Sequence, residues 1–179
     1  VVPDISIRTM WAILLIGIAS GLTALTFAKL AHMWSAWMQK RLPYAPTRPI
    51  VGGVIMAALF YFTSANRYAG LGLDVIAQAF NGPVPTFDFL FKTLFTTFAL
   101  GTGFKGGEVT PLFFVGATLG NAMAAWLHQP EAWLAGLGFV AVFAGAANTP
   151  LACTLMAVEL FGAPMGVSAL IACALSYLC

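Results

Sequence analysis

Apolar residues fill most positions of this chain, in stretches that short groups of glycine, proline and charged residues interrupt. A helix that crosses a lipid bilayer needs roughly 20 mostly apolar residues. The longest stretches without Asp, Glu, Lys or Arg are Thr9–Ala28, Pro49–Asn66, Val109–Pro130, Ala132–Val158 and Leu160–Cys179. The pattern therefore predicts an all-α protein with several membrane-spanning helices and no soluble domain within residues 1–179.

The positions of the breaks predict that some of these helices are tilted or incomplete. The first helix should run from Trp11 to Trp37 or Met38, which is long enough for a tilted span. Ile50–Thr63 and Leu71–Phe80 are short for a crossing and favour partial or re-entrant helices. Irregular backbone at membrane depth is tolerated only where protein or a water-filled cavity covers it, and transporters place binding sites at such breaks.

The second half of the chain should contain further helices. Phe87–Leu100 and Thr110–Leu127 are predicted helices, and in the latter Gly116 and Gly120 are spaced for close packing on a neighbouring helix. The last third should form three helices, since the sequences Asn148-Thr149-Pro150 and Phe161-Gly-Ala-Pro164 break it.

The composition excludes several classes of function. Charged residues make up 8% of the chain, against about 25% in a soluble domain. The net charge of +2 is too sparse and scattered for a nucleic-acid-binding face. The three cysteines, Cys153, Cys173 and Cys179, lie in apolar helical stretches and should be buried, inert thiols. We expect no metal, no cofactor and no enzyme activity, because no paired acids, metal ligands or Ser/His/Asp set converge in the sequence.

A basic linker predicts the orientation in the membrane. The stretch Gln39–Pro49 contains Lys40, Arg41 and Arg48 but no acidic residue. Positively charged loops stay on the cytoplasmic side. We therefore expect this linker in the cytoplasm and Val1–Ser6 outside.

A glycine-rich stretch, Gly101-Thr-Gly-Phe-Lys-Gly-Gly-Glu-Val-Thr-Pro111, precedes the Thr110–Leu127 helix. Proline suits the first helical position and threonine before it can cap the helix, which predicts a start near Thr110. The free amides of such a start can bind an anion. The stretch also fits the dinucleotide pattern G-x-G-x-x-G, but it lacks the preceding strand and the acid about 20 residues later that this site needs. A structural bend without a ligand stays open.

This stretch resembles the second repeat of a CLC anion channel or transporter. The family's Gly-x-Phe-x-Pro pattern, which opens the helix that holds the central anion, stands here as Gly107-Glu108-Val109-Thr110-Pro111. The preceding glycines match the family's Ser-Gly-x-x-Gly-Gly approach. The likeness extends along the whole chain, including the break at Thr149-Pro150-Leu151 and the glutamate at Glu159.

The sequence Gly-Glu-Val-Thr-Pro is similar to the branch of the family that exchanges fluoride for protons. The resemblance implies an anion site formed at Gly107, Glu108, Val109 and Thr110, with two backbone amides and the Thr110 hydroxyl as donors. Gly103, Gly106 and Pro111 would shape the loop and the helix start. We expect the Glu108 carboxylate to turn to Lys105 or to solvent.

Other assignments stay open at this point. Glu159 is a candidate proton relay, with a structural or interfacial role as the alternative. The transported anion could be chloride, in a channel or a chloride/proton exchanger. A structural membrane subunit without a ligand is the alternative from another class.

The family's gating pattern Gly-x-Glu-Gly does not occur in residues 1–179. The resemblance therefore implies a single membrane domain over 1–179 that is one half of an inverted repeat, without the first repeat and the last helix. It also implies a multi-pass protein of the cell (inner) membrane that works as a homodimer. The expected partners are fluoride or chloride, protons and membrane lipid.

Overall fold

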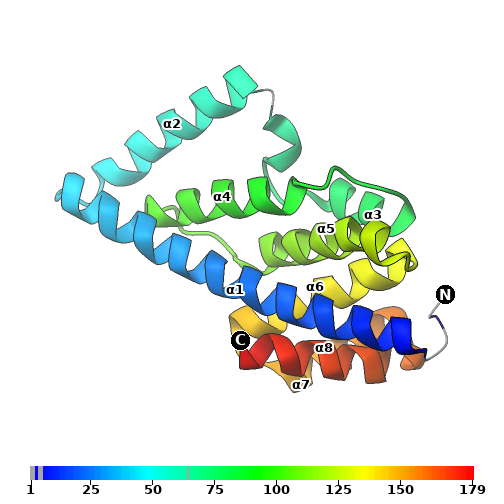
Figure 1. The fold of residues 1–179 in the computed structure, drawn as a ribbon. Helices are drawn as coiled ribbons and strands as arrows, with labels where there is room; N and C mark the ends of the chain where they lie inside the picture. The colour runs from blue at the N-terminus through cyan, green and yellow to red at the C-terminus, as the bar shows by residue number, and fades with distance from the viewer. Residues whose placement is uncertain (1–2, 4–5, 64) are drawn as a thin grey trace.

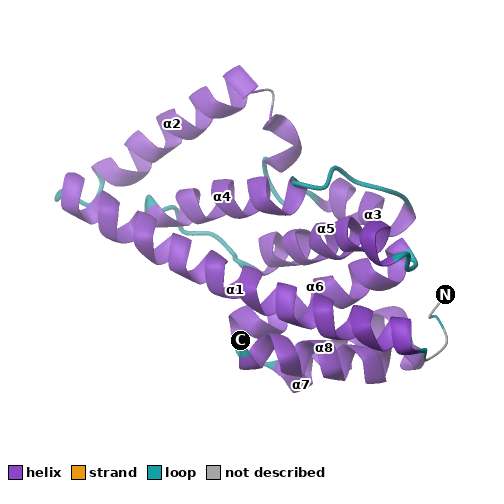
Figure 2. Cartoon of the chain, in the orientation of Figure 1, coloured by secondary structure: helices purple, strands orange, loops and turns teal. Residues whose placement is uncertain are grey.

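The computed structural model of the chain describes residues 3, 6–63 and 65–179. These residues form α-helices and two short 3-10 helices, and no strand occurs among them (Figure 2). The α-helices are α1 (Ile7–Arg41), α2 (Thr47–Thr63), α3 (Leu73–Asn81), α4 (Asp88–Gly101), α5 (Val109–Leu127), α6 (Glu131–Ala147), α7 (Pro150–Phe161) and α8 (Gly166–Leu178), and the 3-10 helices are η1 (Ala65–Tyr68) and η2 (Ala163–Met165). The all-α prediction is confirmed.

Helix α1 runs the length of the molecule and packs against α4, α6 and α8 (Figure 1). The Ser6 hydroxyl caps it by accepting a hydrogen bond from the Thr9 amide, at 3.2 Å. The helix continues to Arg41, so the predicted end at Trp37 or Met38 was too early. It ends two residues before Pro43 because Leu42, the residue that precedes the proline, is pushed out of the helical region.

Helices α5 and α6 form the centre of the fold and pack more closely than any other pair. The spacing of Gly116 and Gly120 on α5 permits this approach, as predicted. A Cβ at Gly120 would meet the carbonyl oxygen of Leu134 on α6, and one at Gly116 would meet that of Gly138. Buried apolar residues from α1, α5, α6, α7 and α8 complete the core around this contact.

Helix α2 diverges from the body of the molecule (Figure 1) but contacts α4 and η1, and Gly52 is its only buried residue. The turn before it is shorter than the linker Gln39–Pro49 predicted, because Lys40 and Arg41 end α1 while Arg48 lies in α2. The Arg48 guanidinium holds this turn by donating to the carbonyl of Leu42 at 2.8 Å and to that of Pro43 at 3.1 Å. Most of Val1–Ser6, the other end of the topology prediction, lies outside the described residues.

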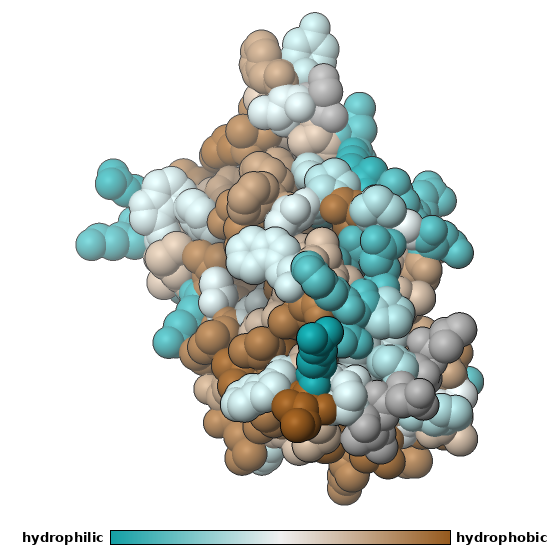
Figure 3. Space-filling model, turned by 45° about the vertical axis from the view of Figure 1, so that its right-hand side comes forward, coloured by the Kyte–Doolittle hydropathy of each residue, from teal (hydrophilic) through white to brown (hydrophobic). Residues whose placement is uncertain are grey.

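By length and composition, α1 and α5 could each cross a membrane, and the other apolar helices are shorter. The short α2 and α3 agree with the predicted incomplete helices, and the last third forms three helices as predicted. Figure 3 shows broad apolar areas on one face, with hydrophilic residues gathered mainly to one side. The shape is that of broken, tilted helices around a central α5–α6 pair.

Candidate functional site

The start of α5 differs from the prediction in one respect. The helix begins at Val109 after Glu108, so Thr110 and Pro111 are its second and third residues and Thr110 does not cap it. The first backbone hydrogen bond runs from the Leu112 amide to the Glu108 carbonyl, at 3.1 Å. Proline is tolerated here because the amides of a first turn have no partner within the helix.

Several hydrogen-bond donors meet at this start without an acceptor. Among the described residues, the amides of Glu108, Val109 and Thr110 donate to no oxygen, and the Thr110 hydroxyl makes no hydrogen bond either. Thr110 is half-buried, whereas Glu108 and Val109 are exposed. The positive end of the helix dipole adds to these donors. Of the predicted site residues, the structure therefore places Gly107, Glu108, Val109 and Thr110 together at one helix end.

The glycine-rich stretch connects α4 to α5 in an open path. Gly103 has a φ of +96°, a conformation that glycine adopts readily, and it turns the chain after α4. Gly106 and Gly107 have open space where a Cβ would stand. A helix, not a strand, precedes this stretch, which contradicts the dinucleotide pattern.

The charged side chains of the prediction form no ion pair among the described residues. Glu108 and Lys105 are both exposed and form no ion pair with each other, so the Glu108 carboxylate turns to solvent. Glu159 is exposed near the end of α7, and its carboxylate has no hydrogen-bond or ion-pair partner among the described residues. Cys153 and Cys173 are buried as predicted, but Cys179 at the end of the chain is exposed.

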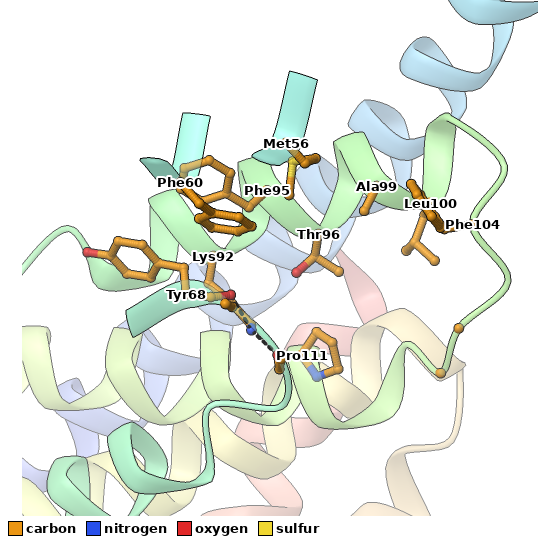
Figure 4. Close-up of a pocket in the computed structure, with 14 residues that line it drawn as sticks. Met56, Phe60, Tyr68, Lys92, Phe95, Thr96, Ala99, Leu100, Phe104 and Pro111 are labelled. Atoms are coloured by element: carbon orange, nitrogen blue, oxygen red, sulfur yellow. Dashed lines mark hydrogen bonds between the residues drawn. The ribbon is translucent and has the colours of Figure 1, made fainter. Parts of the chain in front are cut away.

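A cavity of about 210 Å³ lies between α2, η1, α4 and the glycine-rich stretch (Figure 4). One side of its wall consists of Gly106, Gly107 and Pro111, which were predicted to form or shape the anion site. Tyr68 and Lys92 line the cavity from the other side. The cavity thus joins the start of α5 to residues that the sequence reasoning had not assigned.

A buried polar cluster forms this second side of the cavity. The Asp88 carboxylate, which has no exposed surface, accepts from Arg67 Nε at 2.9 Å and from the Tyr68 hydroxyl at 2.7 Å. Burial and the hydrogen bond to Asp88 raise the pKa of Tyr68 to about 12, so the hydroxyl keeps its proton. Lys92 Nζ donates to the carbonyls of Tyr68, at 2.9 Å, and Gly70, at 2.7 Å.

Sequence reasoning missed this cluster, although one signal was available. Asp88 and Lys92 stand four residues apart in the otherwise apolar helix Phe87–Leu100. Residues at this spacing share a helix face, and charges inside an apolar segment mark functional or paired groups. Their partners are the side chains of Arg67 and Tyr68 and the carbonyls of Tyr68 and Gly70, which no local pattern reveals.

Arg67→Gln should lower the stability of the purified protein by roughly 3–5 kcal/mol, because it leaves the buried Asp88 carboxylate without its cation. Thermal unfolding in detergent measures the effect. Arg41→Gln is the matched control, since Arg41 is exposed at the end of α1 and should change stability little. Similar small shifts for both variants would contradict a stabilising role of the Arg67–Asp88 pair.

Comparison with known proteins shows which family this chain resembles in sequence and fold. The family described as voltage gated chloride channel matches residues 1–179. The chloride/fluoride channel protein of Pseudomonas syringae pv. tomato is 50% identical over 99% of this chain and 40% of its own length. The H(+)/Cl(-) exchange transporter ClcA of Cronobacter sakazakii is 28% identical over 88% of this chain and 36% of its own length.

A solved structure described as a CLC-type fluoride/proton antiporter superposes with a TM-score of 0.94 at 32% identity. The superposition covers 99% of this chain and 45% of that one, so the chain spans less than half the length of these relatives. With a family match over its whole length and this close structural likeness, the chain belongs to the CLC family of voltage gated chloride channels.

Proposed function

We propose that the chain forms half of the anion pathway of a fluoride/proton antiporter. Members of the CLC family are membrane proteins that transport ions. The observation that carries the proposal is the group of unpartnered donors at the start of α5, formed by the amides of Glu108, Val109 and Thr110 and by the Thr110 hydroxyl. Transport, rather than catalysis, is the function that fits these groups.

The donors suit a small anion. A strongly hydrated ion leaves water only where compact hydrogen-bond donors replace its hydration shell. Backbone amides and one hydroxyl provide such donors without introducing a countercharge that would hold the ion too long. The similarity to the chloride/fluoride channel protein and to the fluoride/proton antiporter supports fluoride as the anion.

The remaining parts of the proposal follow from the family likeness. Residues 1–179 are the second inverted repeat of a homodimeric, multi-pass protein of the inner membrane, and the first repeat supplies the gate. Gly103, Gly106 and Pro111 keep the approach to the donors open. A proton relay through Glu159 stays a prediction, and its exposed position on α7 favours the interfacial role.

Fluoride efflux from liposomes that contain the full-length protein tests the proposal. We expect fluoride to leave the liposomes together with proton entry, and an imposed pH gradient should drive fluoride uphill. Chloride is the comparison ion. Chloride flux that exceeds fluoride flux, or fluoride flux that ignores the pH gradient, would contradict fluoride/proton antiport.

The orientation is testable by cysteine labelling. Tyr44→Cys, in a background without native cysteines, should react with an impermeant thiol reagent only from the cytoplasmic side. Tyr44 is 70% exposed in the turn between α1 and α2, which Lys40, Arg41 and Arg48 flank. Labelling from outside intact cells would reverse the proposed topology.

A further inference from the structure

We propose that the cavity between α4 and the Gly106–Pro111 stretch binds a small monovalent inorganic anion through the ammonium of Lys92 and the hydroxyl of Thr96. This position is additional to the donors at the start of α5. The inference rests on the proposed function and deepens it, because it adds a second binding site for the transported anion beside the α5 site.

The first argument is the charge of the buried cluster. Lys92 is 2% exposed, and two of its three N–H groups donate to the carbonyls of Tyr68 and Gly70. Carbonyls satisfy hydrogen bonds, but they do not neutralise a charge. The nearby Asp88 carboxylate already pairs with Arg67, and no other ion pair occurs among the described residues. The cluster therefore keeps one net positive charge, and a buried charge calls for a counterion.

The second argument is the direction of the donors. Thr96 stands four residues after Lys92, on the same face of α4, and both side chains extend toward Pro111 in Figure 4. The hydroxyls of Thr93 and Thr97 bond to carbonyls of their own helix. The Thr96 hydroxyl has no such bond within the described part of the chain, so it is free to donate into the cavity.

The third argument is the wall around these donors. No acidic side chain lines the cavity within the described residues, and its opposite side is the bare backbone of Gly106 and Gly107. The Phe114 ring flanks the ammonium, with its centroid 5.0 Å from Lys92 Nζ. A cavity of about 210 Å³ is several times the roughly 30 Å³ that one water occupies, so it can hold an anion with part of its hydration shell.

The arrangement explains how an anion could reach the α5 amides. Conduction needs sites that attract an ion but release it to the next site. An ammonium already shared with two carbonyls attracts an anion more weakly than a free one does. An anion at Lys92 would therefore move on to the neighbouring α5 donors.

Anion-dependent thermal stability of the full-length protein tests this site, with sodium fluoride and sodium chloride titrated into a gluconate buffer. An anion that binds only the folded protein stabilises it by RT ln(1 + L/Kd), where L is the free anion concentration, so the rise of the Tm with anion concentration gives the Kd. Lys92→Met should raise this Kd at least about tenfold, the change expected for one lost charge-assisted contact. Thr96→Val, which leaves the ammonium and its carbonyl bonds in place, should raise it about threefold.

Tyr68→Phe is the matched control. It removes the hydrogen bond to Asp88 but leaves the Lys92 charge, so it should lower the Tm without changing the anion-dependent increment. A purely structural Lys92 predicts the same behaviour for Lys92→Met. An unchanged Kd in both Lys92→Met and Thr96→Val overturns the inference, and if Lys92→Met does not fold, the result for Thr96→Val alone decides.

The outcome separates this inference from the proposed function. Fluoride efflux that is normal in the wild type, together with unchanged anion stabilisation in both variants, overturns the Lys92 site and leaves antiport standing. Absence of fluoride transport, together with anion stabilisation that depends on Lys92 and Thr96, supports the site and rejects the antiporter.

Discussion

Thr110→Val in the full-length protein is expected to slow fluoride efflux at least about tenfold, with a smaller effect on chloride. Valine keeps the volume of threonine but removes the hydroxyl, which has no other partner among the described residues. A charge-assisted hydrogen bond is worth roughly 1.5–3 kcal/mol, and about 1.4 kcal/mol changes an equilibrium tenfold. Fluoride should suffer most because it depends most on compact donors to replace its water.

Thr110→Ser keeps the hydroxyl and is the control, with near wild-type efflux expected. A threonine that only capped the helix would give a stability loss of about 1 kcal/mol and no anion preference. The structure argues against a capping role for Thr110, since α5 starts at Val109 without a side-chain cap. Efflux of both ions should be measured on folded protein of the correct size, and equal losses for fluoride and chloride would remove the selectivity role of Thr110.

Gly120→Leu is expected to abolish transport of both anions by forcing α5 and α6 apart. Even the Cβ of alanine at Gly120 would meet the backbone oxygen of Leu134, and its carbonyl carbon at 2.6 Å. Backbone atoms cannot turn aside as a flexible side chain can, so Gly120→Ala should already cost about 1–3 kcal/mol, and leucine more. Size-exclusion profiles and thermal unfolding in detergent measure the damage.

Gly82→Ala is the matched control for this series. Gly82 has extended backbone, with a φ of 175°, and its Cβ position has no atom within 4 Å. Alanine there should change the stability by less than about 0.5 kcal/mol. A Gly120→Ala protein with the unfolding temperature of the wild type would show that the α5–α6 contact can relax without cost.

The sequence predicted the helices best where local chemistry marks their ends. The Thr-Pro pairs at Thr110 and Thr149 located the starts of α5 and α7 to within one residue. The start of α5 was misplaced because Pro111 was treated as the first helical residue, although a first turn accepts proline at several positions. The end of α1 was misplaced because Gln39, Lys40 and Arg41 are good helix formers as well as loop residues.

One part of the candidate site could be predicted from the sequence and the other part could not. Its α5 donors are consecutive in sequence, so Glu108, Val109 and Thr110 could be named in advance. The cavity wall joins Tyr68 and Gly70 to Lys92 through backbone carbonyls more than 20 residues away. Every residue has a backbone carbonyl, so the sequence does not show which carbonyls accept from Lys92. Only the folded structure does.

The hydrogen bonds along α4 bear on how this helix enters the bilayer during biosynthesis. The hydroxyls of Thr93 and Thr97 donate to carbonyls of their own helix. Moving these two residues into lipid therefore costs less free energy than moving unpaired hydroxyls. Asp88 and Lys92 gain no such relief within α4, because their partners all lie in residues 67–70. Helix α4 should therefore leave the translocon together with η1, as one inserted unit, rather than as an independent span.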